Sequence, residues 1–317
     1  MISYRVLIAM PLAWDHIDEY GNRFTERGIE YDIPDTKGPL RESALRDEID
    51  AYDGVITGFV GLDEETIEAA TWLQVVSQWG IGLDDIDLDA AEQHGISIYK
   101  TPGAFSEEIA DVVLAYLILL TRRLHVIDRA VRDGDWPAIR GTSLRDRTLG
   151  IVSVGDIGAA VARRGHAHGL DLLGTDIEPL DTELQRETGI ERVLLEDLFA
   201  RADVVSLNCP LTPETRRLVG RDELDRHGRE GYLIKTARGE IVQQGELVDA
   251  LQEGRIAGAA LDVFETEPLP EDHPLTTMEN VVLGSHNVGN TTTAVRRTTE
   301  RAVDNLIVGL TDERDET

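Results

Sequence analysis

Apolar and polar positions alternate along the first hundred residues in a pattern typical of short buried strands separated by amphipathic helices. Apolar runs predict strands at 3–9, 29–33, 52–57, 73–77 and 96–99. Amphipathic segments predict helices at 14–27, 40–49 and 63–70. Strands that alternate with helices in this way form a parallel sheet with helices on both faces. The pattern therefore predicts a small α/β domain before residue 100.

The same alternation returns in the second half of the chain, where polar side chains follow the strands. Strands are predicted at 204–208, 232–236, 257–263 and 281–283. Arg238, Glu267 and His286 each come shortly after one of them. Ligands of an open parallel sheet bind beyond the carboxyl ends of its strands, so these three residues are candidates for chemistry. The last helix, 291–310, is expected to pack on the first domain.

A long apolar helix is predicted between the two halves, beginning near residue 106. Ser106 is expected to cap it, with Glu107 and Glu108 in the first turn and Arg122 and Arg123 at the end, where these charges suit the helix dipole. Because the helix is apolar on nearly all sides, we expect it to be buried, between two domains.

The most informative stretch, residues 148–176, reads as a strand, a glycine turn, a helix and a second strand that ends at Asp176. This arrangement binds dinucleotides. Gly155 leaves room for a pyrophosphate at the backbone, Gly158 lets the helix pack close to the strand, and the helix N-terminus offers N–H groups to phosphate. Asp176 is expected to accept hydrogen bonds from the adenosine ribose.

The turn departs from G-x-G-x-x-G at its first position, which is Ser153. Serine is small enough to fit, but a shifted turn or a lower affinity is an alternative. A glycine turn in an unrelated α/β protein is the other alternative, since this motif alone is weak.

Composition narrows the functional classes. The 317 residues suffice for two domains. With 60 acidic against 31 basic residues, the formal net charge is -29, which would repel nucleic acid and anionic membranes. Acidic residues spread along the chain, with lysine only at Lys37, Lys100 and Lys235, favour a surface adapted to high salt over an ordinary acidic one.

Several kinds of site and location are not expected. The single cysteine, Cys209, excludes an intrachain disulfide and a cysteine metal cluster, and no run has metal-ligand spacing. The apolar segment 109–120 is too short to span a bilayer. The N-terminus carries no signal-peptide pattern, so a cytoplasmic protein is expected.

Three runs resemble the D-2-hydroxyacid dehydrogenase family. YLIKTARG at 232–239 is similar to the family's arginine motif, GAALDVFETEPLP at 258–270 to its glutamate motif, and LGSHNVGNT at 283–291 to its histidine motif, with Ser285 where proline is usual. The order and spacing match over essentially the whole chain. The resemblance implies a flavodoxin-like substrate domain, residues 1–100 plus 290–317, and an inserted Rossmann cofactor domain, residues 101–289. It also implies a homodimer formed through the cofactor domains.

The resemblance implies reduction of a 2-keto acid to a D-2-hydroxy acid, and the reverse reaction. His286 is the candidate proton donor, because imidazole titrates near neutral pH, and Glu267 would hold its other nitrogen. Arg238 would bind the carboxylate and the keto oxygen through its fork of donors. Backbone N–H groups of the loop formed by Gly80, Ile81 and Gly82 would complete the substrate site.

The cofactor is expected to be NAD or NADP. Asp176 would repel a 2′-phosphate and so favours NAD, although Arg163, Arg164 and His166 could offset that repulsion. The resemblance implies that Asp262 faces the nicotinamide. The other expected cofactor contacts are Asp156, Ile157, Cys209, Pro210, Thr236, Ala237 and His286.

An alternative from another class stays open, that of a dinucleotide-sensing binding protein like the corepressors that share this fold. It predicts cofactor binding without turnover. The absence of a basic or low-complexity tail argues against it. The identity of the keto acid and the oligomeric state cannot be predicted from the sequence, and Trp79 and Trp136 fit a substrate pocket and core packing equally well.

Overall fold

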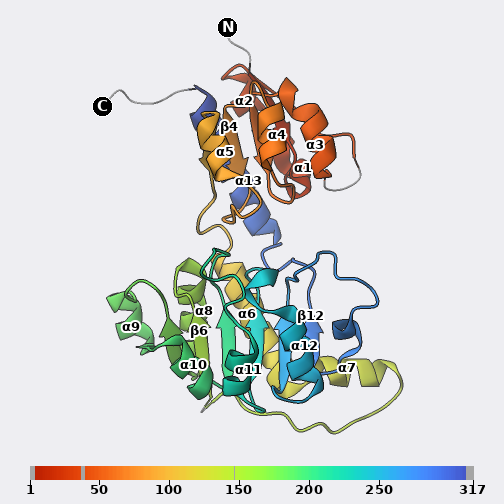
Figure 1. Cartoon of the computed structure of the whole chain (residues 1–317), viewed down its shortest axis with the longest axis vertical. Helices are drawn as coiled ribbons and strands as arrows, with labels where there is room; N and C mark the ends of the chain where they lie inside the picture. Colours follow the sequence, from red (N-terminus) through yellow and green to blue (C-terminus); the bar gives the residue numbers. More distant parts are fainter. Residues whose placement is uncertain (1–3, 37–39, 146, 312–317) are drawn as a thin grey trace. The chain divides into compact units, whose positions relative to one another are not determined.

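A computed structural model describes residues 4–36, 40–145 and 147–311 of the chain. The chain divides into two compact units, Met1–Ala104 with Asn290–Thr317, and Phe105–Gly289 (Figure 1). In the described residues each unit contains one sheet, and all strand pairs of both sheets are parallel. No helix among these residues is long and apolar enough to cross a bilayer.

The first unit has a five-stranded sheet in the order β2-β1-β3-β4-β5, the flavodoxin-like order. Its strands are β1 (Tyr4–Ile8), β2 (Ile29–Asp32), β3 (Gly54–Thr57), β4 (Val75–Gln78) and β5 (Ser97–Tyr99). Its helices are α1 (Pro11–Ile17), α2 (Gly21–Thr25), α3 (Glu42–Glu48), α4 (Glu64–Ala69), α5 (Leu88–Gln93) and α13 (Thr292–Thr311). Every residue of β3 and β4 is buried, as expected of central strands covered on both faces.

The C-terminal helix α13 packs closely on β3 and β4 of this unit. The Ser77 hydroxyl donates to the Ala302 carbonyl at 2.9 Å, and Trp79 Nε1 donates to Thr299 Oγ1 at 3.0 Å. A Cβ at Gly54 would lie 2.9 Å from a Leu306 methyl group, so a larger residue here would have to displace the Leu306 side chain.

The predicted continuous helix over 14–27 is wrong. The chain instead forms α1, a 3-10 turn (Asp18–Tyr20) and α2. Pro11 occupies the first turn of α1, where its missing N–H costs nothing, so the helix starts earlier than predicted. The 3-10 turn lies directly before Gly21, a poor helix former that begins α2.

The second unit has a seven-stranded sheet in the order β12-β11-β10-β9-β6-β7-β8, a Rossmann order with one added strand. Its strands are β6 (Thr148–Val152), β7 (Asp171–Thr175), β8 (Glu191–Arg192), β9 (Val204–Leu207), β10 (Tyr232–Lys235), β11 (Gly258–Leu261) and β12 (Val281–Leu283). Its helices are α6 (Ser106–Arg122), α7 (Leu124–Arg132), α8 (Asp156–Ala167), α9 (Thr182–Thr188), α10 (Leu195–Arg201), α11 (Arg221–His227) and α12 (Gln244–Gln252). The predicted fold class, two doubly wound α/β domains, is confirmed. Which unit binds substrate and which binds cofactor stays a prediction.

The long helix α6 differs from its prediction at two points. Phe105 is the N-cap and makes no side-chain cap bond, while Ser106 is already helical. Only one face of α6 is buried. Its outer face carries polar residues such as Asp111, whose carboxylate lies 2.6 Å from Arg164 of α8. The buried positions are Ala110, Val113, Tyr116, Leu117, Leu120 and Thr121.

Candidate functional site

The turn between β6 and α8 has the features that dinucleotide binding requires. A Cβ at Gly158 would lie 2.1 Å from the Ser153 carbonyl oxygen, so α8 packs on the turn at a distance that only glycine permits. A Cβ at Gly155 would meet no heavy atom within 4 Å, which leaves open space in front of the backbone. Asp156 and Ile157 open the twelve-residue helix α8, whose first N–H groups have no partner within the helix.

Ser153 takes the backbone conformation of the glycine that the motif prescribes. Its φ is 68°, in the left-handed region that non-glycine residues adopt at a cost of about 1–2 kcal/mol. Its hydroxyl donates to Asp176 Oδ2 at 3.2 Å, which offsets part of that cost. Serine therefore fits the turn.

Asp176 follows β7 and hydrogen-bonds to the same turn between β6 and α8. Its Oδ2 accepts from the Val154 N–H at 2.7 Å and its Oδ1 from the Glu178 N–H at 3.1 Å. Two backbone bonds thus fix the carboxylate beside the open backbone of Gly155. Open space, a helix N-terminus and an oriented carboxylate together fit a dinucleotide with a free ribose 2′-hydroxyl.

Cys209 and Pro210 follow β9, the strand next to β6. Burial, with a smaller contribution from the Asp176 charge, raises the pKa of the Cys209 thiol to about 11. A thiol with so high a pKa is a poor nucleophile at neutral pH, so Cys209 fits a packing position beside the turn.

Glu267 and His286 form a hydrogen-bonded pair beyond the carboxyl ends of β11 and β12. Glu267 Oε2 lies 2.7 Å from His286 Nδ1, and Glu267 Oε1 accepts from the Phe264 N–H at 2.8 Å. Burial would raise the pKa of Glu267, but these bonds and the nearby charges of His286 and Arg238 outweigh it and lower that pKa. An ionised carboxylate can only accept, so the contact requires a proton on Nδ1 and leaves Nε2 as the ring nitrogen that can exchange a proton with a substrate.

The backbone of His286 is itself held in an uncommon conformation. Its φ is 56°, and its N–H donates to the Asp262 carbonyl at 2.7 Å. Non-glycine residues in this region are enriched at functional sites, where the surroundings impose the geometry.

Arg238 lies after β10, the neighbour of β11 in the sheet. Its charge is near enough to lower the pKa of Glu267, and one of its Nη atoms donates to the Ala237 carbonyl at 2.9 Å. The preceding Thr236 is buried, so the turn 236–239 is well packed. The structure therefore brings Arg238, Glu267 and His286 together at one sheet edge, while their catalytic roles stay predictions.

Asp262 is a buried carboxyl at the same edge, and it has a partner that the sequence did not reveal. Burial raises its pKa, against hydrogen bonds from the Val288 and Asn287 N–H groups, the His286 charge and the Tyr116 hydroxyl. Tyr116 lies on the buried face of α6 and donates to Asp262 Oδ1 at 3.3 Å. In the sequence, the one sign of this partner is that Tyr116 lies at helical spacing among apolar residues that face the core.

The loop formed by Gly80, Ile81 and Gly82 belongs to the first unit and follows β4. Gly80 has a φ of 152° and its N–H donates to Thr101 Oγ1 at 2.9 Å. That N–H is therefore engaged within the unit, and the predicted substrate contact now depends on Ile81 and Gly82.

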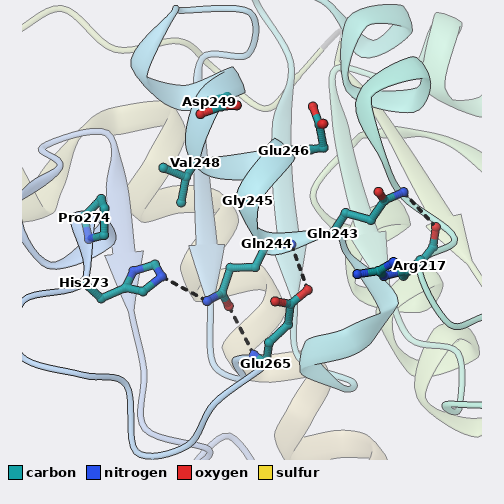
Figure 2. A pocket seen from close by; sticks show the side chains of 10 residues that line it. All are labelled: Arg217, Gln243, Gln244, Gly245, Glu246, Val248, Asp249, Glu265, His273 and Pro274. Carbon is teal, nitrogen blue, oxygen red and sulfur yellow. Dashed lines mark hydrogen bonds between the residues drawn. The ribbon is translucent and has the colours of Figure 1, made fainter.

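A separate hollow of about 500 Å³ lies at the N-terminus of α12 (Figure 2). Gln244 links its walls by contacting Glu265 and His273. None of the predicted site residues lines it. Its lining residues are Arg217, Gln243, Gln244, Gly245, Glu246, Val248, Asp249, Glu265, His273 and Pro274.

Comparison with known proteins identifies the family. Residues 114–288 match the family model described as "D-isomer specific 2-hydroxyacid dehydrogenase, NAD binding domain". A glyoxylate reductase of Korarchaeum cryptofilum is 39% identical over 298 residues, which cover 92% of this chain and 90% of the relative. The chain belongs to the D-2-hydroxyacid dehydrogenase family.

Solved structures of two reductases share the fold of this chain. The crystal structure of a glyoxylate reductase from Paecilomyes thermophila superposes with a TM-score of 0.88 at 27% identity, covering 99% of this chain and 97% of that one. An NADPH-dependent glyoxylate/hydroxypyruvate reductase from Sinorhizobium meliloti, in complex with NADP and malonate, gives a TM-score of 0.82 at 28% identity, covering 97% and 93%.

This dehydrogenase is thus an NAD(P)-dependent oxidoreductase that interconverts 2-keto acids and 2-hydroxy acids. The comparisons give no support to the alternative of a corepressor-like sensor without turnover. They allow NAD as well as NADP.

Proposed function

We propose that this dehydrogenase reduces small 2-keto acids of the size of glyoxylate and hydroxypyruvate to D-2-hydroxy acids. The relatives named for these two substrates support the size class. The observation that carries the catalytic assignment is the Glu267–His286 contact of 2.7 Å beside Arg238.

In the proposed mechanism the chain's own residues hold the substrate and supply the proton. The Arg238 guanidinium binds the carboxylate and keto oxygen of the substrate through its fork of donors. His286, oriented by Glu267, donates a proton from Nε2 to the keto oxygen during reduction and accepts it during oxidation. The bound nicotinamide supplies or accepts the hydride at the substrate's C2.

We also propose that NADH is the preferred cofactor. Asp176 is fixed by backbone N–H groups beside the turn, so it cannot easily swing away from a 2′-phosphate. The remaining cofactor contacts would come from Gly155, Asp156, Ile157, Gly158, Cys209, Pro210, Thr236, Ala237 and Asp262.

A homodimer in a salt-rich cytoplasm completes the proposal. In the described chain α7 has no buried residue, and Trp136 in the segment after it is 90% exposed. Exposed apolar side chains on a helix and its flanking segment are typical of an interface. The net charge of -29 supports the high-salt setting. Sedimentation of the wild type and of Trp136→Ser in molar salt tests this: a monomeric wild type contradicts the dimer.

The test of function measures oxidation of NADH and NADPH with a panel of straight and branched 2-keto acids in molar salt. His286→Ala should lower turnover at least about a hundredfold while NADH still binds. Near-normal turnover in His286→Ala would remove His286 from the mechanism. Cofactor binding without turnover on any keto acid would contradict the enzymatic proposal as a whole.

A further inference from the structure

Lys235, at the end of β10, is fully buried in a chain that has only three lysines. Its exposed fraction is 0%. An ammonium group is costly to bury unless it is hydrogen-bonded and faces opposite charge. A lysine at such a position therefore calls for a specific role.

The Lys235 side chain closes the turn that carries Arg238. Its Nζ donates to the Gly239 carbonyl at 2.9 Å, and its own carbonyl accepts from the Asp262 N–H at 3.0 Å. Gly239 comes directly after Arg238, so the ammonium group holds the far end of the 236–239 turn. The two ends of the turn are thereby tied to each other and to β11.

Gly239 in turn packs against the loop that carries Glu267. A Cβ at Gly239 would lie 1.9 Å from the Phe264 carbonyl oxygen, so the two backbones touch. The Phe264 N–H donates to Glu267 Oε1 at 2.8 Å. The Lys235 ammonium group therefore bonds to backbone at the point where the arginine turn meets the glutamate loop.

A reciprocal pair of hydrogen bonds between Gln244 and Glu265 also fixes this loop (Figure 2). The Gln244 N–H donates to Glu265 Oε1 at 3.0 Å, and the Glu265 N–H donates to Gln244 Oε1 at 3.2 Å. Gln244 thus holds the glutamate loop at Glu265, and Lys235 bonds to Gly239 of the turn that packs against this loop.

Carboxylates around Lys235 explain how its charge is tolerated. Burial lowers the pKa of Lys235 to about 8, and the negative charges of Glu265, Glu267 and Glu240 oppose that decrease. The group thus stays protonated at neutral pH, and an ammonium donor makes a stronger bond to a carbonyl than a neutral one.

We propose that Lys235 is a positioning residue, whose buried ammonium group fixes the 236–239 turn and thereby sets how tightly Arg238 binds the keto-acid carboxylate. This inference rests on the proposed function. A merely structural role for Lys235 predicts lower stability without a change in substrate affinity.

The test compares steady-state kinetics of Lys235→Met and Lys235→Gln with glyoxylate and NADH. Lys235→Met keeps the length but removes the donor, and should raise KM for the keto acid about tenfold or more, equivalent to about 1.4 kcal/mol for a lost bond from a charged donor. The kcat should change less, and NADH affinity should stay at the wild-type value. Lys235→Gln keeps an N–H donor and should recover part of the KM.

Two control variants separate positioning from stability. Lys100→Met removes an exposed lysine and should change nothing. Leu198→Ala opens a cavity in the core beside Gly150 of β6, so it should lower stability with an unchanged KM. An increase of KM in Leu198→Ala equal to that in Lys235→Met would overturn the inference, because any loss of stability would then suffice.

The outcomes distinguish this inference from the proposed function. A wild type that turns over no 2-keto acid overturns both. Wild-type turnover with an unchanged KM in Lys235→Met overturns the inference alone. If Lys235→Met does not fold, ε-13C-lysine NMR of the wild type replaces it, with Lys235 assigned through Lys235→Gln. The Lys235 signal should shift when oxamate, a keto-acid analogue, binds together with NADH, and an unmoved signal at saturating oxamate overturns the inference.

Discussion

Replacing Gly158 by alanine should lower the stability of this dehydrogenase, whereas replacing Gly155 by alanine should lower its affinity for the cofactor. At Gly158 the new Cβ would lie 2.1 Å from the Ser153 carbonyl oxygen and 3.2 Å from Ile151 Cγ2. At Gly155 it would meet no heavy atom within 4 Å, and the φ of −72° suits alanine. The first change is a clash within the fold, and the second adds a methyl group where the cofactor is expected.

The expected magnitudes follow from these distances. A methyl carbon needs roughly 3.2 Å from a carbonyl oxygen, so the turn in Gly158→Ala must open by about 1 Å. Because the obstacle is backbone, which cannot rotate away, the free energy of unfolding should fall by about 3 kcal/mol. For a unit of the size of Phe105–Gly289 this corresponds to a fall in Tm of about 6–12 °C. Gly155→Ala should change stability by less than about 1 kcal/mol.

Thermal unfolding by circular dichroism and fluorescence titration with NADH, both in molar salt, measure the two effects. Gly158→Ala should unfold earlier, whereas Gly155→Ala should keep its Tm and lose about tenfold or more in NADH affinity, equivalent to about 1.4 kcal/mol. A wild-type Tm for Gly158→Ala would refute the steric reasoning. Wild-type NADH affinity for Gly155→Ala would show that the pyrophosphate does not approach the backbone there.

Three further predictions concern charged or titratable side chains. Asp176→Asn keeps an acceptor for the Val154 N–H but removes the negative charge, so the NADPH-to-NADH ratio of KM values should fall about tenfold, and an unchanged ratio would exclude Asp176 from cofactor choice. Burial lowers the pKa of His227, so folding stability should decrease as the pH falls below about 6.5, where the unfolded chain takes up the proton first. Urea unfolding at several pH values should show a weaker decrease for His227→Gln, and an equal slope of unfolding free energy against pH in the two proteins would contradict this. Arg238→Lys should mainly raise KM for the keto acid, since a lysine cannot make the bidentate contact, and equal KM values would remove Arg238 from carboxylate binding.

The fold and the sheet edge that carries the site could be predicted from the sequence because both depend on simple patterns. Short apolar runs separated by amphipathic segments leave few topologies other than a parallel sheet, and residues that follow neighbouring strands must then meet at one edge. The contact between Glu267 and His286 follows from that rule together with the family's spacing. Details of helices were predicted less well, since Gly21 and Phe105 act through local backbone preferences that apolar periodicity does not report.

Three features at the site depend on tertiary structure and were not predictable. Lys235 ends a strand and reads as a solvent-facing cation, because nothing in the local pattern reveals the carbonyl that it reaches four residues later. Ser153 adopts a left-handed backbone that the sequence pattern assigns to glycine. Tyr116 lies 146 positions from Asp262, so their hydrogen bond emerges only when α6 packs on the sheet.

The left-handed backbone of His286 has a consequence for mutational drift. Glycine adopts that conformation freely and asparagine more readily than most residues, whereas β-branched residues do so at a penalty. Replacing His286 by glycine would therefore relieve backbone strain while removing the proposed proton donor, so at this position a loss of activity is expected to accompany a more relaxed backbone. A lineage released from selection for turnover should accumulate glycine or asparagine at position 286 early, and would leave behind stable, folded, inactive descendants.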